Sequence, residues 1–153
     1  MNYWLFKSEP HVFGIDDLER AKTSVWDGVR NYQARNYLRT AQIGDVAFFY
    51  HSSAQPTGIV GVCNVIETNI DDPSQFDPKS KYFDLKSTPA MPRWQTVKVQ
   101  YQSKFPRMLS LDELKTKFTG DEFVLVRKGM RLSVMPVSES VAKRILTLAT
   151  ATS

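Results

Sequence analysis

The sequence predicts an α+β fold in which a mostly antiparallel, curved and barrel-like β-sheet carries helices on its outside. Strands and helices are expected in the order β-α-α-β-β-β-α-β-α, and the three consecutive strands favour hairpin-like neighbours. The segment "TVKVQY" alternates apolar and polar residues, as a strand does when one face of its sheet meets water. Two other segments repeat apolar residues at helical spacing. The 153 residues suit one domain, which we expect over residues 1–150.

The first strand is expected over residues 2–8, "NYWLFKS". Its alternation places Trp4 and Phe6 on one face and Leu5 and Lys7 on the other. Pro10 lacks the N–H that a strand ladder needs and therefore ends the strand. Residues 14–22, "GIDDLERAK", then form a short helix whose early acidic residues suit its positive N-terminal end.

A second helix is predicted over residues 31–41, and it carries two distinct stripes. Its apolar face consists of Ala34, Tyr37, Leu38 and Ala41. A neighbouring stripe at the same spacing consists of Tyr32, Arg35, Asn36 and Arg39. A buried helix face therefore accounts for Tyr37 but leaves Tyr32 and the arginines without a reason.

Three strands and an irregular excursion follow. Residues 46–52, "VAFFYHS", and 59–67, "IVGVCNVIE", are predicted strands, and Gly61 within the second indicates a bulge or a close backbone approach. Residues 71–92 contain four prolines and are expected to be irregular. Residues 93–105 form the strand described above, which belongs to a sheet with one face that meets water.

The last third of the chain is predicted to contain two helices and two short strands. Ser110 and Glu113 form a capping box that begins one helix. The segment "FVLVR" is read as a strand or short helix, and "RLSVMPV" as a strand. Ser138 caps a final helix with a buried face that consists of Val141, Ala142, Ile145, Leu148 and Ala149.

Charge is unevenly distributed along the chain. Twenty Lys and Arg residues face sixteen Asp and Glu residues, so the net charge is +4. Residues 85–111 contain no acidic residue but five basic ones, and Arg127, Lys128 and Arg131 form a second basic run. This segregation is compatible with a polyanionic partner.

Cysteine usage and hydropathy indicate a reducing compartment. Cys63 is the one cysteine, so the chain has no intramolecular disulfide, and its apolar surroundings indicate a core residue. The N-terminus lacks the pattern of a signal peptide, and no apolar run reaches the length of about 18 residues that spans a membrane. We therefore expect a cytoplasmic protein without a membrane partner.

The sequence lacks the residues that several classes of enzyme require. Two histidines and one cysteine are too few for a zinc site of usual spacing, and no glycine-rich phosphate loop is present. His51 and Ser52 are neighbours on a strand, so their side chains point to opposite faces and cannot act as base and nucleophile. The sequence thus predicts a binding module with no catalytic residue, metal or cofactor.

The loop before the second helix offers what an unstacked base requires. Such a base needs an aromatic face, a few hydrogen-bond partners and cations for its phosphates. Trp26 and Asp27 lie in this loop, and Arg30 and Asn31 lie where the helix begins, an end that suits anions. Each also has a structural alternative: the tryptophan can fold onto the core, and the aspartate can cap a turn.

Six segments, in this order and spacing, resemble the EVE domain family. They are "YWLFKSEP", "WDGVRNYQARNYLR", "GDVAFFYHS", "GIVGV", "PRWQTVKVQY" and "RLSVMPV". The resemblance covers residues 1–148 and implies a PUA-like fold, a small curved β-barrel with flanking helices. Members of the family are implicated in recognising modified bases, including modified cytosines in DNA.

Carried over motif by motif, the resemblance implies a pocket for one base. Lys7 and Ser8 would edge the pocket, Trp26 would be its stacking wall and Asp27 a polar contact. The other implied ligand-binding residues are Arg30, Asn31 and Tyr32 at the rim, His51 and Ser52 from "FFYHS", and Arg131, Leu132 and Ser133 from "RLSVM". A second aromatic wall is not evident, because Trp4 is expected in the core and Trp94 at a strand start.

These observations together predict a non-catalytic reader that holds one modified base of DNA or RNA in an aromatic pocket with a basic rim. The alternatives are an enzyme that acts on a modified nucleobase or nucleoside, with Asp27 or Glu9 as general acid or base, and a small-molecule or protein-interaction domain on the same fold.

Overall fold

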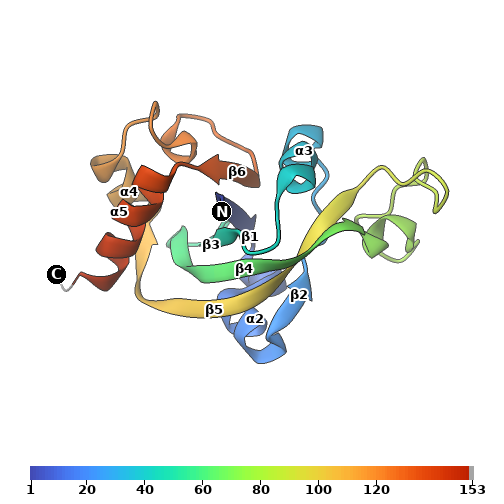
Figure 1. Cartoon of the computed structure of the whole chain (residues 1–153), viewed down its shortest axis with the longest axis horizontal. Helices are drawn as coiled ribbons and strands as arrows, with labels where there is room; N and C mark the ends of the chain where they lie inside the picture. The colour runs from blue at the N-terminus through green and yellow to red at the C-terminus, as the bar shows by residue number, and fades with distance from the viewer. Residues whose placement is uncertain (152–153) are drawn as a thin grey trace.

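The computed structural model describes residues 1–151 and contains six strands that form one sheet (Figure 1). The N-terminal half comprises β1 (Tyr3–Ser8), α1 (Pro10–Phe13), α2 (Ile15–Ala21), β2 (Thr23–Val25), α3 (Tyr32–Thr40) and β3 (Val46–His51). The C-terminal half comprises β4 (Gly58–Asp71), the 3₁₀ turn η1 (Pro73–Phe76), β5 (Gln95–Ser110), α4 (Leu111–Lys117), the 3₁₀ turn η2 (Val124–Val126), β6 (Val134–Val137) and α5 (Glu139–Thr150).

The sheet has the order β2-β5-β4-β3-β1-β6, and the prediction of a mostly antiparallel α+β fold is confirmed. One pair is parallel: β1 lies beside β3, with Ser8 opposite His51. The two strands therefore end at the same edge of the sheet. The expected curved β-barrel is not closed: among residues 1–151, β2 and β6 lie at opposite edges of the sheet order, and each pairs with a strand on one side only. Closure requires a continuous ring of strand pairing, which these short strands of three and four residues do not complete.

Both faces of β1 are covered by hydrophobic clusters, which explains the alternation read from this strand. Trp4 and Phe6 belong to one hydrophobic cluster, whereas Leu5 packs in a second cluster with residues of α5. Figure 1 shows α4 and α5 together at one end of the molecule, with α3 above the sheet and α2 below it. Cys63 is fully buried, and burial raises the pKa of its thiol to about 12, as suits an unreactive core residue.

Several boundaries differ from the sequence prediction for local reasons. The second helix begins at Tyr32 rather than Asn31, because the Asn31 side chain accepts a hydrogen bond from the Ala34 N–H and caps the helix. The capping box of α4 is half formed: Ser110 accepts from the Glu113 N–H, but the Glu113 carboxylate pairs with Arg107. The segment "FVLVR" contains the 3₁₀ turn η2, and the strand in "RLSVMPV" begins only at Val134.

The excursion between β4 and β5 is irregular, as expected, but it is held by an internal polar network. Gln75 is fully buried and donates to the backbone oxygens of Asp72 and Trp94. The Gln75 side-chain oxygen accepts from the Ser87 hydroxyl and from the Trp94 N–H. Figure 1 shows this excursion projecting from the end of the sheet opposite α5. Its position is therefore fixed by hydrogen bonds that span it from end to end.

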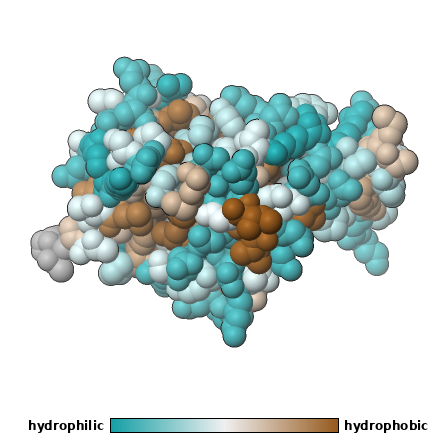
Figure 2. Space-filling view, in the orientation of Figure 1, coloured by the Kyte–Doolittle hydropathy of each residue, from teal (hydrophilic) through white to brown (hydrophobic). Residues whose placement is uncertain are grey.

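Within residues 1–151, none of the helices combines the length and apolar character that crossing a bilayer requires. Figure 2 shows that one face of the molecule is predominantly hydrophilic, with hydrophobic surface confined to separate groups.

Candidate nucleic-acid interface

A cavity of about 760 Å³ opens where β1 and β3 end. The parallel pairing of these strands brings Lys7 and Ser8 beside Ser52, as their positions at strand ends suggested. Four further segments complete the wall: α1, the end of β2 with the loop that follows it, the excursion between β4 and β5, and the chain that enters β6. The lining residues are Lys7, Ser8, Glu9, Val12, Phe13, Ser24, Val25, Trp26, Asp27, Gly28, Val29, Ser52, Ser53, Tyr82, Arg131 and Ser133.

Trp26 lies on the cavity wall but is largely covered. The centroid of its ring lies 5.3 Å from that of Phe6 and 5.3 Å from that of Phe49, which it meets edge to face. Only 6 % of the residue remains exposed. Its backbone is pinned as well, since its N–H donates to the Val97 oxygen and its oxygen accepts from the Thr96 hydroxyl. The expectation of a freely exposed stacking wall is therefore corrected: the indole forms a rigid part of the floor, where only a small area can touch a ligand.

Tyr82 supplies an aromatic wall that the sequence did not reveal. A Cβ atom added to Gly28 would lie 2.6 Å from the Tyr82 ring, so the ring packs directly on the backbone of the Trp26 loop. The Arg30 guanidinium holds the Tyr82 carbonyl oxygen at 2.8 and 3.0 Å and lies 5.7 Å from the ring centroid. Phe13, from α1, is a further aromatic lining residue. The cavity therefore has three aromatic sides from three separate segments.

The cavity wall carries charges of both signs. Burial lowers the pKa of Lys7, whose ammonium lies 5.7 Å from the Tyr50 ring centroid. Within residues 1–151, no carboxylate lies within salt-bridge distance of that ammonium. Desolvation, with the nearby Asp72 charge, raises the pKa of Asp27. In the part of the chain that the structure describes, an ammonium without a carboxylate partner and a carboxyl group thus line the cavity together, and they provide a donor and an acceptor for a heterocycle.

Three predicted rim residues position the cavity wall instead of lining it. Arg30 forms an ion pair with the buried Asp72 at 3.0 Å and donates to Ser74. Asn31 caps α3, as described above. The ring of Tyr32 stacks on that of Trp94, with the two centroids 4.9 Å apart. The Arg35 guanidinium lies 4.6 Å from the Tyr32 ring centroid. The second stripe of the helix, which had no reason in the sequence, thus binds the excursion to α3.

Of the remaining predicted residues, some line the cavity and others make contacts within the fold. Ser133 and Arg131 line the cavity, whereas Leu132 packs against both hydrophobic clusters. His51 lies next to the cavity edge but accepts a hydrogen bond on Nε2 from the Ile15 N–H at 3.1 Å. It therefore satisfies the first turn of α2 rather than facing a ligand. Among residues 1–151, no group of three or more His, Cys, Asp or Glu side chains could hold a metal ion.

The hydrogen bond that His51 accepts predicts that the folded protein loses stability as the pH falls. Burial lowers the pKa of His51, and a protonated Nε2 could not accept from Ile15. The unfolded chain therefore takes up this proton first, so stability is complete above about pH 6.5 and falls as pH drops from there towards the lower folded-state pKa. Thermal unfolding between pH 7.5 and 5 should show a smaller acid-dependent loss of Tm in His51→Gln than in the unsubstituted protein. His11→Gln, which removes the exposed imidazole, is the control, and equal losses in all three proteins would refute the role.

Comparison with known proteins places this chain in a family. The family model "EVE domain" matches residues 2–148, so the chain belongs to the EVE domain family. Thymocyte nuclear protein 1 of Rattus norvegicus is 39 % identical over 165 residues, which cover 96 % of this chain and 73 % of the rat protein.

Two solved structures are similar along almost their whole length. A protein from Pseudomonas syringae has a TM-score of 0.93 and 46 % identity, covering 96 % of this chain and 99 % of that chain. Human THYN1 protein, solved in complex with DNA that contains 5-methylcytosine, has a TM-score of 0.91 and 34 % identity, covering 100 % of both chains.

Proposed function

We propose that this protein is a non-catalytic reader of DNA that carries a modified base, and that it holds one flipped or unpaired base, with 5-methylcytosine the first candidate, in the cavity at the ends of β1 and β3. The observation that carries the proposal is the cavity itself, which combines aromatic sides, an unpaired ammonium and a carboxyl group. The human relative solved with 5-methylcytosine-containing DNA supports the choice of ligand.

The polar groups suit the hydrogen-bonding edge of a cytosine. That base offers an amino donor at N4 and acceptors at N3 and O2. The Asp27 carboxylate, on the cavity wall, accepts from the N4 amino group. Lys7 is available for O2 or for the phosphate of the same nucleotide. The preference for cytosine thus arises from two side chains that the strand and loop geometry fixes.

The apolar part of the wall accounts for selection of a methyl group. Val12, Phe13 and Val29 line the cavity beside its polar groups. Burial of one methyl group contributes about 0.8 kcal/mol, so contact with these side chains gives roughly a fourfold preference over unmethylated cytosine. Phosphate contacts, from Arg131 at the cavity edge among others, supply affinity that does not depend on sequence.

Fluorescence anisotropy with a matched set of oligonucleotides tests this proposal. We expect tighter binding to DNA with 5-methylcytosine than to the unmodified strand, and affinity that falls as salt rises. Arg131→Gln should weaken binding to every oligonucleotide by a similar factor and flatten the salt dependence, because it removes one phosphate contact. Lys143→Gln makes the same charge change on α5, where Lys143 pairs with Glu139, and should leave binding unchanged.

The affinities for methylated and unmethylated RNA, measured in the same assay, decide whether the protein distinguishes ribose from deoxyribose. Equal affinity for modified and plain strands of both nucleic acids would contradict base reading, and affinity that is insensitive to salt would contradict phosphate contact.

A further inference from the structure

The outer end of the excursion between β4 and β5 exposes apolar side chains beside basic ones. Phe83, Leu85 and Met91 are 38 %, 83 % and 77 % exposed, although they lie within nine residues of one another. At the end of the molecule opposite α5, Figure 2 shows small tan and brown groups among hydrophilic residues. Single exposed apolar residues are common on protein surfaces, but a group of three at the end of one projection needs a reason.

These side chains are held outward by an ordered backbone. The Lys86 N–H donates to the Asp84 carboxylate and the Ser87 N–H to the Asp84 carbonyl, which closes one tight turn. Thr88 and Met91 form an isolated β-bridge that closes the next turn. The buried Gln75 network described above anchors Ser87 beneath them. Exposure of the apolar group is therefore a property of the folded excursion.

The apolar group begins where the cavity ends. Tyr82 is an aromatic wall of the cavity, and Arg30 fixes its carbonyl oxygen. Leu85 follows only three residues later, so its backbone lies within about 10 Å of that wall. One continuous segment thus connects the proposed base pocket to the exposed apolar end.

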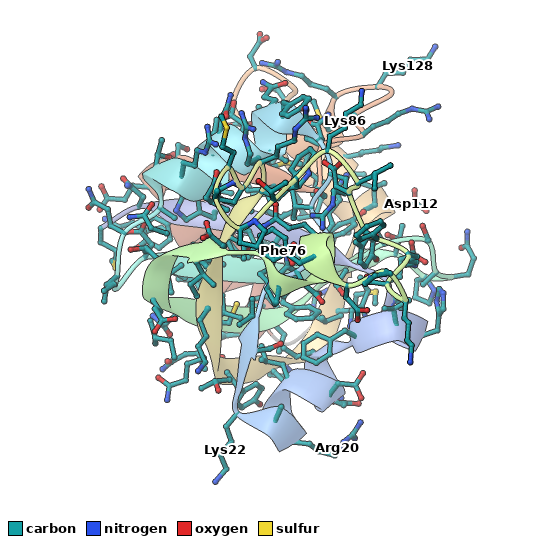
Figure 3. All side chains as sticks on the ribbon, turned by 90° about the vertical axis from the view of Figure 1, so that its right-hand side faces the viewer. Arg20, Lys22, Phe76, Lys86, Asp112 and Lys128 are labelled. Carbon is teal, nitrogen blue, oxygen red and sulfur yellow. The ribbon has the colours of Figure 1, made fainter. Side chains whose placement is uncertain are left out.

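The charge around the apolar group is positive. Lys81 lies 5.1 Å from the Tyr82 ring centroid, and Lys86 is exposed. Figure 3, which views the molecule from this end, shows Lys86 extending towards the upper edge. The nearby carboxylate, Asp84, accepts from the Trp94 indole N–H at 2.8 Å and so turns inward. Exposed apolar side chains and two lysines on one segment suit the stacked bases and flanking phosphates of a nucleic-acid duplex.

We infer that this end of the excursion is a wedge that enters the duplex at the position from which the base has been extruded. The inference rests on the proposed function. Extrusion of a base leaves its neighbours unstacked, and apolar side chains such as Leu, Met and Phe lower the cost when they fill such a gap. Leu85 and Met91 are the two most exposed candidates for the filling side chains, and Lys81 and Lys86 contact the phosphates on either side of the gap.

The double variant Leu85→Ser/Met91→Ser tests the wedge with three DNA probes. The first probe is a duplex with a paired 5-methylcytosine, the second has a mismatch opposite that base, and the third is the methylated single strand. We expect the variant to bind the paired duplex about tenfold more weakly than the unsubstituted protein, the mismatched duplex only a few-fold more weakly, and the single strand equally well. This order follows because the paired base costs most to extrude and the single strand leaves no gap.

Controls separate this inference from the proposed function. Ile43→Ser removes a side chain that is 70 % exposed in the loop before β3, at the other end of that strand from the cavity, and it should bind all three probes normally. An equal loss on the single strand, or no loss on the paired duplex, would overturn the wedge while the base pocket stands. Absence of any preference for the methylated single strand in the unsubstituted protein would overturn the proposed function first.

Discussion

Asp72→Ala is expected to lower the free energy of unfolding by about 3–5 kcal/mol, because it leaves a cation without its partner in the protein interior. Asp72 is 1 % exposed and directly follows β4, which ends at Asp71. Its carboxylate accepts from the Gly28 N–H at 2.8 Å, from Arg30 at 3.0 Å and from the backbone and hydroxyl of Ser74. One side chain therefore joins the Trp26 loop, the start of α3 and the excursion.

Binding should also be lost in this variant, at temperatures where the protein is still folded. Without Asp72, the Gly28 N–H and the Arg30 guanidinium lose the acceptor that they share, and only the Arg30 bonds to the Tyr82 carbonyl oxygen and to Ser74 still join Arg30 to the excursion. The contact between Tyr82 and the Trp26 loop therefore loosens. We expect affinity for the methylated strand to fall at least tenfold. Chemical denaturation measures the first effect and anisotropy below the transition the second.

Asp71→Ala is the matched control for these measurements. It removes the same charge from the adjacent residue, which is exposed. Its free energy of unfolding should change by less than about 0.5 kcal/mol, as for other surface substitutions. If both aspartates proved equally tolerant of alanine, the role assigned to the Asp72 carboxylate as the central acceptor would be wrong.

The elements of this fold were largely readable from the sequence, because its patterns are local. Alternation in residues 3–8 and the apolar spacing on α3 record which side chains meet the core, and both were confirmed. The same reasoning missed β2, which is three residues long and is defined by pairing with β5 across about 75 residues of chain. It also predicted a curved β-barrel but not that the sheet stays open, because the connections between strands do not reveal whether the edges of a sheet meet.

The cavity was predictable only in part, for a related reason. Residues at the ends of β1 and β3 could be assigned to one site as soon as those strands were placed side by side. Tyr82 could not, because it lies in the irregular excursion and is held at the cavity by Arg30, which binds its carbonyl oxygen, and by the Gly28 contact. Arg30 was identified for its charge, but its guanidinium forms an ion pair with Asp72 of the same chain. A cation close to an aromatic residue in sequence does not reveal whether its partner is a ligand or the protein itself.

Gly28→Ala is the second substitution for which we expect a large effect, since it places a methyl group between the Trp26 loop and the Tyr82 ring. Gly28 has a φ of +83°, which an alanine adopts only with strain, and the new Cβ would lie 2.6 Å from the ring. The strain alone costs about 1–3 kcal/mol. The contact is too short to persist, so Tyr82 must move and the cavity must lose that wall. We expect binding to the methylated strand to weaken by roughly tenfold or more.

Two further variants separate strain from displacement of the ring. Gly44→Ala has a φ of +95° but no atom within 4 Å of the added Cβ, so it reports the backbone cost alone and should leave binding unchanged. Adding Tyr82→Ala to Gly28→Ala removes the clash, so the double variant should lose less stability than the two single losses sum to. Its affinity should nevertheless stay low, because the aromatic wall is absent. Normal affinity in the double variant would show that Tyr82 takes no part in holding the base, and the pocket would then have to rely on Phe13 and the small exposed area of Trp26.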